Sequence, residues 1–185
     1  MKYLILFLLT VSAVSCKWED DEPFCNYPQK FAVSMTTTTA TINLNLYAGK
    51  WYEIARKPDT FEAGCNCATA QYTLNPAGYV DVVNTCTTLN GQTKAADAKA
   101  YSTNSPQNTK LEVYFNPNAG GNYWILDIDP NYQWVVVGEP CRKDAWILSR
   151  TPELDGAVLS NEISLLLKKG YTVNDLVYRK RTCTN

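Results

Sequence analysis

The stretch LYAGKWYEIARKPDTFEAGCNC, residues 46–67, places a Gly-x-Trp-Tyr sequence at the head of a mostly apolar run and a Cys-x-Cys at its tail. We expect the apolar run to form a strand, because aromatic and β-branched residues favour that conformation. An indole so close to a glycine suits a place where ring and backbone approach each other, since glycine has no side chain. Cys65 and Cys67 cannot easily pair with each other, so each needs another partner.

The composition excludes several classes of protein. The chain has 185 residues, with 17 basic and 18 acidic side chains and a formal net charge of -1. It shows no concentrated basic patch, so we expect no nucleic-acid partner. It contains no histidine, which removes serine and cysteine triads with a histidine base and most catalytic zinc sites. We therefore expect neither a metal nor a cofactor.

The N-terminus has the pattern of an export signal. Residues 1–16 read MKYLILFLLTVSAVSC, with one lysine, an apolar run and then small residues. A membrane span needs about 20 apolar residues, so we interpret residues 1–15 as a signal peptide. Ala13 and Ser15 satisfy the small-x-small rule for cleavage before Cys16. We expect a secreted protein, and the alternative is an outer-membrane lipoprotein anchored through Cys16.

Most of the chain has the pattern of an all-β domain. Residues 16–46 carry acidic residues, threonines and prolines, which indicate an extended arm. Residues 47–185 are expected to form one domain with a C-terminal helix and tail. Its short runs rich in valine, tyrosine, tryptophan and isoleucine are separated by turn residues, as in a sandwich or barrel. The eight runs are 49–57, 67–74, 79–85, 93–101, 110–115, 122–127, 133–138 and 145–149, with Gly120 and Gly121 placed in a turn.

One helix is expected near the C-terminus, in DGAVLSNEISLLLKKG at residues 155–170. Apolar residues recur there at helical spacing, and Gly170 suits the C-terminal cap. The sequence TVNDLVYRKR after it predicts a short edge strand. The helix needs an apolar surface to cover, and its expected buried stripe consists of Val158, Leu159, Ile163, Leu166 and Leu167.

Two architectures are compatible with eight sequential strands. Antiparallel strands joined mostly by tight turns close naturally as an up-and-down barrel, whose interior can hold one small ligand. A sandwich of two sheets accounts for the same spacing about equally well. The spacing alone does not choose between them.

Three ordered motifs resemble those of the lipocalin family. They are Gly49-x-Trp51-Tyr52, YWILDID at residues 123–129 and WILSRTP at residues 146–152. The likeness is greatest to the branch of apolipoprotein D, bacterial lipocalins and temperature-induced lipocalins, which shares WYEIAR, ATAQYTL and KLEVYF. It runs from about residue 46 to residue 178. The resemblance implies an eight-stranded antiparallel up-and-down β-barrel with one C-terminal α-helix packed outside.

The motif residues have a physical role in such a barrel. An indole packed across one end closes the floor, and Gly49 lets the neighbouring backbone approach Trp51 closely. Arg150 ends the last strand, so we expect its guanidinium over the Trp51 ring, a cation–π contact worth about 0.5–2 kcal/mol. Many members have Thr-Asp-Tyr after the sixth strand. This chain has Ile128-Asp129-Pro130, which keeps the acidic Asp129 in a different turn sequence.

Alternation along the strands predicts which side chains face the interior. Leu148 and Trp146 share the face of Arg150, while Trp124 and Leu126 are left for the outer face. The resemblance implies that the residues matching Tyr72, Asn84, Tyr123 and Trp146 line a cavity for an apolar or amphipathic ligand. The candidate ligand-binding residues are Tyr72, Asn84, Tyr123, Ile125, Trp146 and Leu148.

The seven cysteines predict an oxidised framework. The resemblance implies two bridges, Cys25–Cys141 and Cys67–Cys183. Cys65 and Cys86 then remain at adjacent ends of a hairpin, where a third bridge is geometrically reasonable. Residues two apart share a face, so different partners for Cys65 and Cys67 require a β-bulge at residues 65–67. The alternative is a metal site of Cys65, Cys67 and Cys86, which exported thiolates do not favour.

The leading hypothesis is a secreted carrier without catalytic activity. Its expected partner is a small hydrophobic ligand or lipid, such as a fatty acid, a lysophospholipid or a sterol-like molecule. Peripheral membrane contact and a monomer or weak homodimer accompany this hypothesis. One alternative is a lipocalin-type enzyme that uses Cys65 or Cys67 in the cavity. Another is a ligand-free interaction or defence protein.

Overall fold

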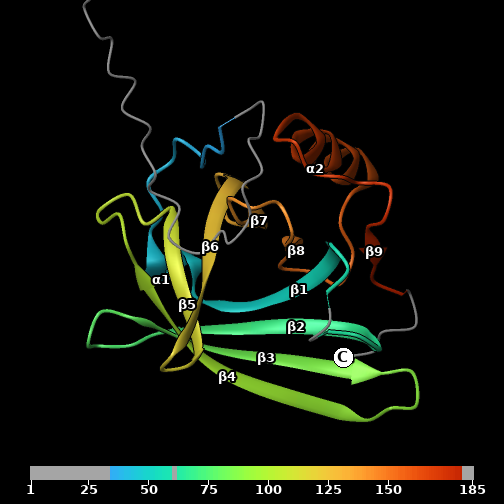
Figure 1. Cartoon of the computed structure of the whole chain (residues 1–185), viewed down its shortest axis with the longest axis horizontal. Helices are drawn as coiled ribbons and strands as arrows, with labels where there is room; N and C mark the ends of the chain where they lie inside the picture. Colours follow the sequence, from blue (N-terminus) through green and yellow to red (C-terminus); the bar gives the residue numbers. More distant parts are fainter. Residues whose placement is uncertain (1–33, 60–61, 181–185) are drawn as a thin grey trace, which may run out of the picture.

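A closed antiparallel barrel forms the body of the computed structural model, which describes residues 34–59 and 62–180 (Figure 1). Each strand pairs with the next one along the chain, and β1 pairs with both β2 and β8, which closes the ring. The predicted up-and-down barrel is therefore confirmed, and the alternative of a two-sheet sandwich is excluded. The strands are β1 Gly49–Arg56, β2 Cys65–Leu74, β3 Val80–Thr88, β4 Thr93–Ser102, β5 Lys110–Asn116, β6 Ala119–Ile128, β7 Trp134–Gly138 and β8 Ala145–Ser149.

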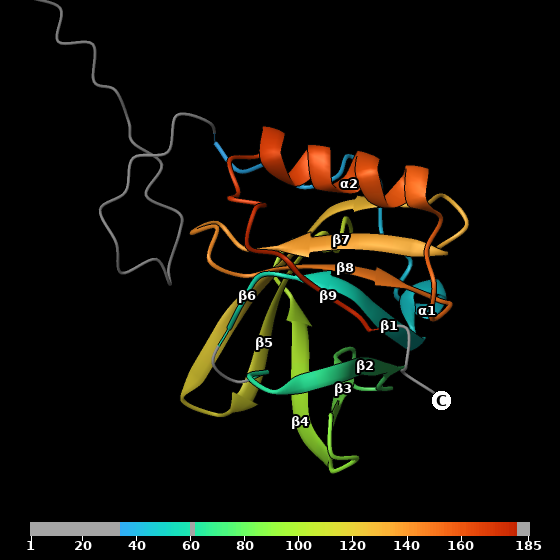
Figure 2. The same ribbon diagram turned by 90° about the vertical axis from the view of Figure 1, so that its right-hand side faces the viewer.

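The predicted helix and edge strand are both present. Helix α2, Gly156–Lys168, lies across the outside of the barrel over β7 and β8 (Figure 2). The side chain of Asp155 accepts hydrogen bonds from the first turn, and Gly170 follows the helix with a φ of 88°. The short strand β9, Val177–Tyr178, adds to β1 outside the ring.

Alternation sorts the strand residues into two separate buried clusters. Tyr123 and Ile125 belong to the cluster inside the barrel. Trp124 and Leu126 belong to a second cluster on the outer wall, against Leu166 of α2. The predicted inward and outward faces of β6 are confirmed, and α2 covers the apolar outer face that its own stripe requires.

One residue of the expected helical stripe is assigned wrongly. Leu166 is fully buried, whereas Leu167 is 60% exposed. Leu159, Ile163 and Leu166 follow one another at steps of four and three residues, and Leu167 lies about 100° further round the helix. Leu165 packs against the outer cluster at the edge of the stripe.

Two glycines expected in a turn belong to a strand. Gly120 and Gly121 pair with Tyr114 and Val113 of β5, so β6 begins earlier than predicted. A Cβ added at Gly120 would lie 2.7 Å from the ring of Tyr114. The missing side chain lets this aromatic ring lie against the β6 backbone, which explains why glycine is compatible with a strand here.

The end of the expected extended arm is partly helical. Residues Leu44–Tyr47 form the short helix α1, whose N-cap Asn43 accepts a hydrogen bond from the backbone of Asn45. Ile42, just before it, is buried in the inner cluster. The predicted signal peptide, Cys16 and most of the arm lie outside the described residues. Within residues 34–59 and 62–180, no helix is both long and apolar enough to cross a membrane.

Helix α2 carries one carboxylate into its packed face. Glu162 is 6% exposed, and its Oε2 has no hydrogen-bond partner among the described residues. Burial, and then the charge of Asp127 on β6, raises the pKa of Glu162 from 4.5 to about 7. Lys169, which follows α2, also lies close enough to Asp127 for the two charges to interact. The folded state therefore binds this proton more tightly than the unfolded state, and this contribution is lost as the pH rises through about 7.

Replacing Glu162 by glutamine removes the titrating group while keeping its size. We expect Glu162→Gln to melt with the parent protein near pH 4.5 and roughly 2–4 °C above it at pH 8. Calorimetric melting temperatures across this range test the expectation. The exposed Glu153→Gln serves as the matched control. Equal melting temperatures of Glu162→Gln and the parent at pH 8 would contradict this account.

Candidate ligand-binding cavity

An indole and a guanidinium close one end of the barrel. Trp51 is completely buried, and the guanidinium carbon of Arg150 lies 3.8 Å from the centre of its ring. The predicted cation–π contact is therefore present. Gly49 has a φ of 104°, and a Cβ there would approach Nη1 of Arg150 to 3.2 Å. Glycine thus provides both the positive φ and the space that this floor requires.

Arg150 also ties together several loops at the floor. Its guanidinium donates hydrogen bonds to the carbonyl oxygens of Leu46, Tyr47, Lys50 and Tyr132 at 2.7–3.1 Å. The first two carbonyls belong to α1, whose last carbonyl groups otherwise have no intrahelical donor. A planar group with five donors suits this arrangement better than an ammonium.

Asp129 organises the turn that Arg150 contacts. Its Oδ2 accepts hydrogen bonds from the backbone N–H groups of Asn131 and Gln133 at 3.0 and 3.1 Å. The carboxylate therefore holds the β6–β7 turn, whose Tyr132 carbonyl accepts a bond from Arg150. Ile128 and Pro130 differ from the residues that flank the acidic residue in many lipocalins. Asp129 nevertheless holds the turn.

Small residues keep the upper interior hollow. Ala68 and Ala70 on β2, Ala96 and Ala100 on β4, and Gly121 on β6 all face a cavity of about 830 Å³. Larger side chains can fill an eight-stranded barrel completely. The volume lies in the usual range of small-molecule sites. The cavity runs from the aromatic floor to the end of the barrel that bears the β1–β2 and β7–β8 loops.

Five of the six candidate ligand-binding residues lie on the cavity wall. Ile125 does not: it is fully buried, within the inner cluster that also contains Ile42 and Val137. Alternation correctly predicts that this side chain points inward. It does not predict that neighbouring side chains separate it from the cavity. Contact with a ligand stays a prediction for the five residues on the wall, which are Tyr72, Asn84, Tyr123, Trp146 and Leu148.

Three tyrosines form the bottom of the cavity above Trp51. The hydroxyl of Tyr123 lies 2.6 Å from that of Tyr47 and 3.0 Å from that of Tyr72. The rings of Tyr47 and Tyr72 stack with centroids 5.6 Å apart, and Tyr47 also contacts Trp51. Burial raises the pKa of all three phenols, that of Tyr72 to about 12, so the group is uncharged at neutral pH.

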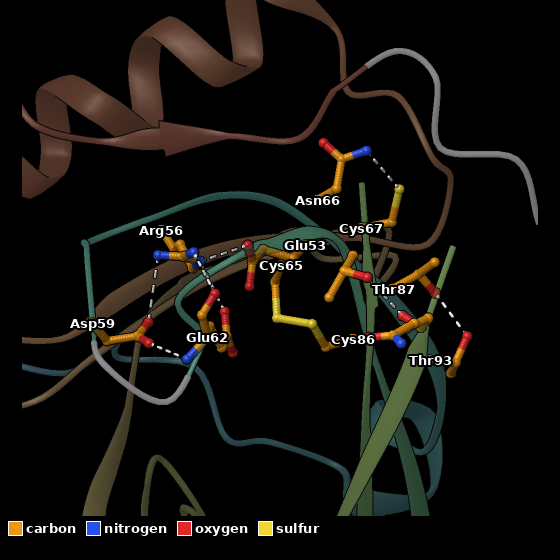
Figure 3. The surroundings of a disulfide bond; sticks show 12 residues. Glu53, Arg56, Asp59, Glu62, Cys65, Asn66, Cys67, Cys86, Thr87 and Thr93 are labelled. Carbon is orange, nitrogen blue, oxygen red and sulfur yellow. Dashed lines mark hydrogen bonds and ion pairs between the residues drawn. A yellow bond between two sulfur atoms is a disulfide. The ribbon is translucent and has the colours of Figure 1, made fainter. Parts of the chain in front are cut away.

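Near the opposite end, one arginine contacts three carboxylates (Figure 3). Nε of Arg56 lies 3.2 Å from Glu53 and 2.9 Å from Glu62, and Nη1 lies 3.5 Å from Asp59. Glu53 and Glu62 both line the cavity, and the indole of Trp146 donates a hydrogen bond to Glu62. The site therefore combines an apolar middle with a different set of polar groups at each end.

The two cavity glutamates influence each other's ionisation. Burial, followed by the nearby charge of Glu62, raises the pKa of Glu53 well above its ordinary value. Burial also raises the pKa of Glu62, although its hydrogen bond with Glu53 works in the opposite direction. Both glutamates therefore hold a proton more strongly than an exposed glutamate does.

A disulfide closes the wall beside these carboxylates. Cys65 and Cys86 are bonded, as predicted, and both line the cavity (Figure 3). The strand register shifts between Cys65 and Cys67, which confirms the predicted bulge. Cys67 and Cys141 each take part in a further disulfide. The pairs Cys25–Cys141 and Cys67–Cys183 each include a cysteine outside the described residues, so these pairings stay predictions.

Residues 42–181 match the family model described as a lipocalin-like domain. The chain belongs to the lipocalin family. It is 35% identical over 137 residues to the outer membrane lipoprotein Blc of Vibrio cholerae, covering 73% of this chain and 80% of that protein. It is 34% identical over 144 residues to temperature-induced lipocalin-1 of Arabidopsis thaliana, covering 73% and 77%. Apolipoprotein D of Macaca fascicularis is 33% identical over 150 residues, covering 76% and 75%.

A solved structure supports the lipocalin fold. Insecticyanin from the tobacco hornworm Manduca sexta superimposes with a TM-score of 0.65 and 19% identity, covering 84% of this chain and 88% of that one. At this identity the likeness concerns the fold alone. Lipocalins as a family bind small hydrophobic ligands, which agrees with the hollow, largely apolar interior.

Sequence reasoning missed several polar residues of this lipocalin cavity, among them Glu53, Tyr47 and Glu62. Glu53 could have been found, because it stands two residues after Trp51 and alternation gives both the same face. Tyr47 precedes the first strand and reaches the interior only through the unpredicted turn of α1. Glu62 lies in a loop without periodicity, so no sequence pattern indicates its direction.

Removing the floor clamp should destabilise the protein strongly. We expect Arg150→Ala to lower the free energy of unfolding by about 2–3 kcal/mol, because a cation–π contact and several charge-assisted hydrogen bonds are lost together. Arg150→Lys should recover only part of this, since an ammonium cannot reach the same set of carbonyls. Urea unfolding at neutral pH measures both changes. The exposed Lys99→Ala, which loses a cation–π contact with Tyr79, is the control, and an equal effect there would contradict the account.

Removing the Cys65–Cys86 bridge should weaken the fold through the unfolded chain. The two cysteines are 21 residues apart, and closing a loop of this size stabilises a protein by about 3 kcal/mol. We expect the double variant Cys65→Ala/Cys86→Ala to lose about this much in urea unfolding without reductant. A loss below about 1 kcal/mol would show that the bridge hardly restricts the unfolded chain.

Proposed function

We propose that this lipocalin binds a small hydrophobic or amphipathic molecule in the barrel cavity and carries it, without catalysing a reaction on it. The observation that carries the proposal is the cavity of about 830 Å³. It lies between the three floor tyrosines and the cluster that Arg56 forms with Glu53, Asp59 and Glu62. Its walls are mainly apolar, with Trp146 and Leu148 on one side and the alanines of β2 and β4 on the other. Burial of an apolar chain there supplies about 0.8 kcal/mol per methylene before the costs of association.

The cysteine chemistry supports a carrier over an enzyme. A nucleophilic or redox cysteine acts as its thiolate. Cys65 is bonded to Cys86 in the cavity wall, and Cys67 is disulfide-bonded as well. Neither sulfur has a thiol to offer in this state, and the same bonds remove the alternative metal site of three thiolates. The hollow interior also argues against a ligand-free interaction protein, whose core gains nothing from a void.

We also propose that the carrier acts outside the cytoplasm, either secreted or anchored to an outer membrane through Cys16. Its relatives include proteins named outer membrane lipoprotein, which supports the second route. Peripheral contact with a membrane during ligand transfer is part of the proposal. Leu89 on the β3–β4 hairpin and Phe115 at the end of β5 are exposed and lie toward the cavity mouth, in keeping with such contact. A monomer or weak homodimer is the proposed assembly.

The proposal predicts binding that grows with the length of an apolar chain. We expect quenching of Trp146 fluorescence by a homologous series of straight-chain molecules, with affinity rising about tenfold for every two methylenes until the cavity is full. Bound ligand should also raise the melting temperature. If no member of the series quenches fluorescence or raises the melting temperature, the carrier function is wrong.

A matched pair of variants separates the cavity from the outer surface. A Cβ at Gly121 meets nothing within 4 Å, so Gly121→Phe should place a ring in the cavity without strain. We expect this variant to lose at least tenfold in affinity while its stability is kept. Val83→Phe adds the same ring on the outer face of β3, where Val83 is exposed, and should bind as the parent does. Equal binding by both variants would place the ligand elsewhere.

A further inference from the structure

The tyrosine floor contains more hydrogen-bond donors than it can use. Three hydroxyl groups, those of Tyr47, Tyr72 and Tyr123, are joined by two contacts of 2.6 and 3.0 Å, both of which involve Tyr123. Each neutral phenol carries one proton. Two contacts use two protons, so one O–H remains without an acceptor whichever way the hydroxyls rotate.

No other described group accepts that third proton. Among residues 34–59 and 62–180, the hydroxyls of the three tyrosines make no hydrogen bonds beyond the two that join them. Tyr47 and Tyr72 are buried, and all three side chains line the cavity. A buried donor that lacks an acceptor is unfavourable by roughly 1–3 kcal/mol. An acceptor inside the cavity, from water or from a bound molecule, would therefore complete the hydrogen bonding of the floor.

Among the described residues, no cationic side chain lines the cavity at the tyrosine floor. Arg150 does not line the cavity, and its guanidinium is engaged with Trp51 and four backbone carbonyls. Two lysines line the cavity, and both lie at the opposite end. Lys94 stands opposite Cys86 in the β3–β4 register, and Lys143 lies in the β7–β8 loop. A carboxylate at the floor would lose its hydration without direct contact with a counter-ion, since the charge of Arg150 reaches the floor only from behind Tyr47 and Tyr72. Burying it therefore costs more than burying an uncharged acceptor.

We propose that this cavity selects long, uncharged molecules with a terminal hydrogen-bond acceptor, such as alcohols and ketones, and holds that end at the tyrosine floor. The inference rests on the proposed carrier function and narrows its ligand class. The apolar part of the molecule then lies along Leu148 and the alanine walls, with its far end near Trp146. Fatty acid anions, in this arrangement, bind more weakly, because the lysines that line the cavity lie only at the mouth.

Three probes of similar size test the selection: 1-dodecanol, tridecane and dodecanoate, with affinities measured by calorimetry or tryptophan quenching at pH 7.5. We expect dodecanol to bind about fivefold more tightly than tridecane, which is the equivalent of one net hydrogen bond of about 1 kcal/mol. Dodecanoate should also bind more weakly than dodecanol. Gly121→Phe should weaken all three, which places them in the cavity.

The proton count makes an unusual prediction for tyrosine variants. Tyr72→Phe leaves two hydroxyls joined by one contact, so one proton is still in surplus and the preference for dodecanol over tridecane should persist. The triple variant Tyr47→Phe/Tyr72→Phe/Tyr123→Phe has no hydroxyl left and should bind the two molecules equally. A role of the tyrosines in packing alone would not separate these variants. Tridecane binding by the triple variant shows at the same time that its cavity has formed.

The outcomes distinguish the two levels of the proposal. Equal binding of dodecanol and tridecane by the parent protein would overturn the selection, with water then supplying the acceptor, and would leave the carrier function standing. Tighter binding of dodecanoate would likewise overturn it. If the triple variant forms no cavity, the single variant Tyr72→Phe still tests the surplus proton. Loss of its preference for dodecanol over tridecane would then overturn the proposal. Failure of all three probes would remove the carrier function and the inference together.

Discussion

The contact between Trp51 and Arg150 is the constraint on which the rest of the barrel depends. It joins β1 to the end of β8, so it fixes the ring where the chain closes on itself. The same guanidinium binds the carbonyls of α1 and of the β6–β7 turn. Because those bonds hold α1 across the barrel end, they also hold Tyr47 at the bottom of the cavity. The floor and the site are thus one structure, and the small, positive-φ residue Gly49 is what lets the backbone fit beneath the guanidinium.

The two faces of the barrel wall solve different packing problems. On the outside, Leu166 of α2 covers Trp124, Leu126 and their neighbours, so this face is closely packed. Gly138 contributes by having no side chain, since a Cβ there would lie 2.1 Å from the hydroxyl of Tyr171, which bonds to the backbone of Glu139. On the inside, alanines on β2 and β4 leave volume unfilled. The stability of the molecule therefore comes largely from its outer layer and its floor, which leaves the upper interior free for a ligand.

Much of this fold could be predicted from sequence because its signals are local or carried by motifs. Turn residues delimit the strands, helical spacing marks α2, and Trp51 and Arg150 stand in recognisable motifs. The bulge at residues 65–67 followed from a conflict between alternation and the expected cysteine partners, and the shifted register confirms it. Other features depend on tertiary packing that no local pattern encodes. Alternation gives Ile125 its direction but not the cover that excludes it from the cavity. Tyr47 enters the site from a stretch that has the composition of a loose arm, and Gly120 belongs to a strand only because the ring of Tyr114 lies against it.

The polar groups at the two ends of the cavity differ in charge. At the mouth, Arg56 lies against Glu53, Asp59 and Glu62, and burial raises the pKa of both glutamates. At the floor, burial keeps the three phenols neutral, and the nearest guanidinium is already engaged. Charge is therefore tolerated at one end only, while the other end offers uncharged donors. In the proposed carrier, such a cavity would orient an elongated molecule as well as enclose it, because reversing the molecule would exchange the surroundings of its two ends. Orientation then follows from the same residues that close the barrel, and needs no feature of the mouth beyond space for the chain to enter.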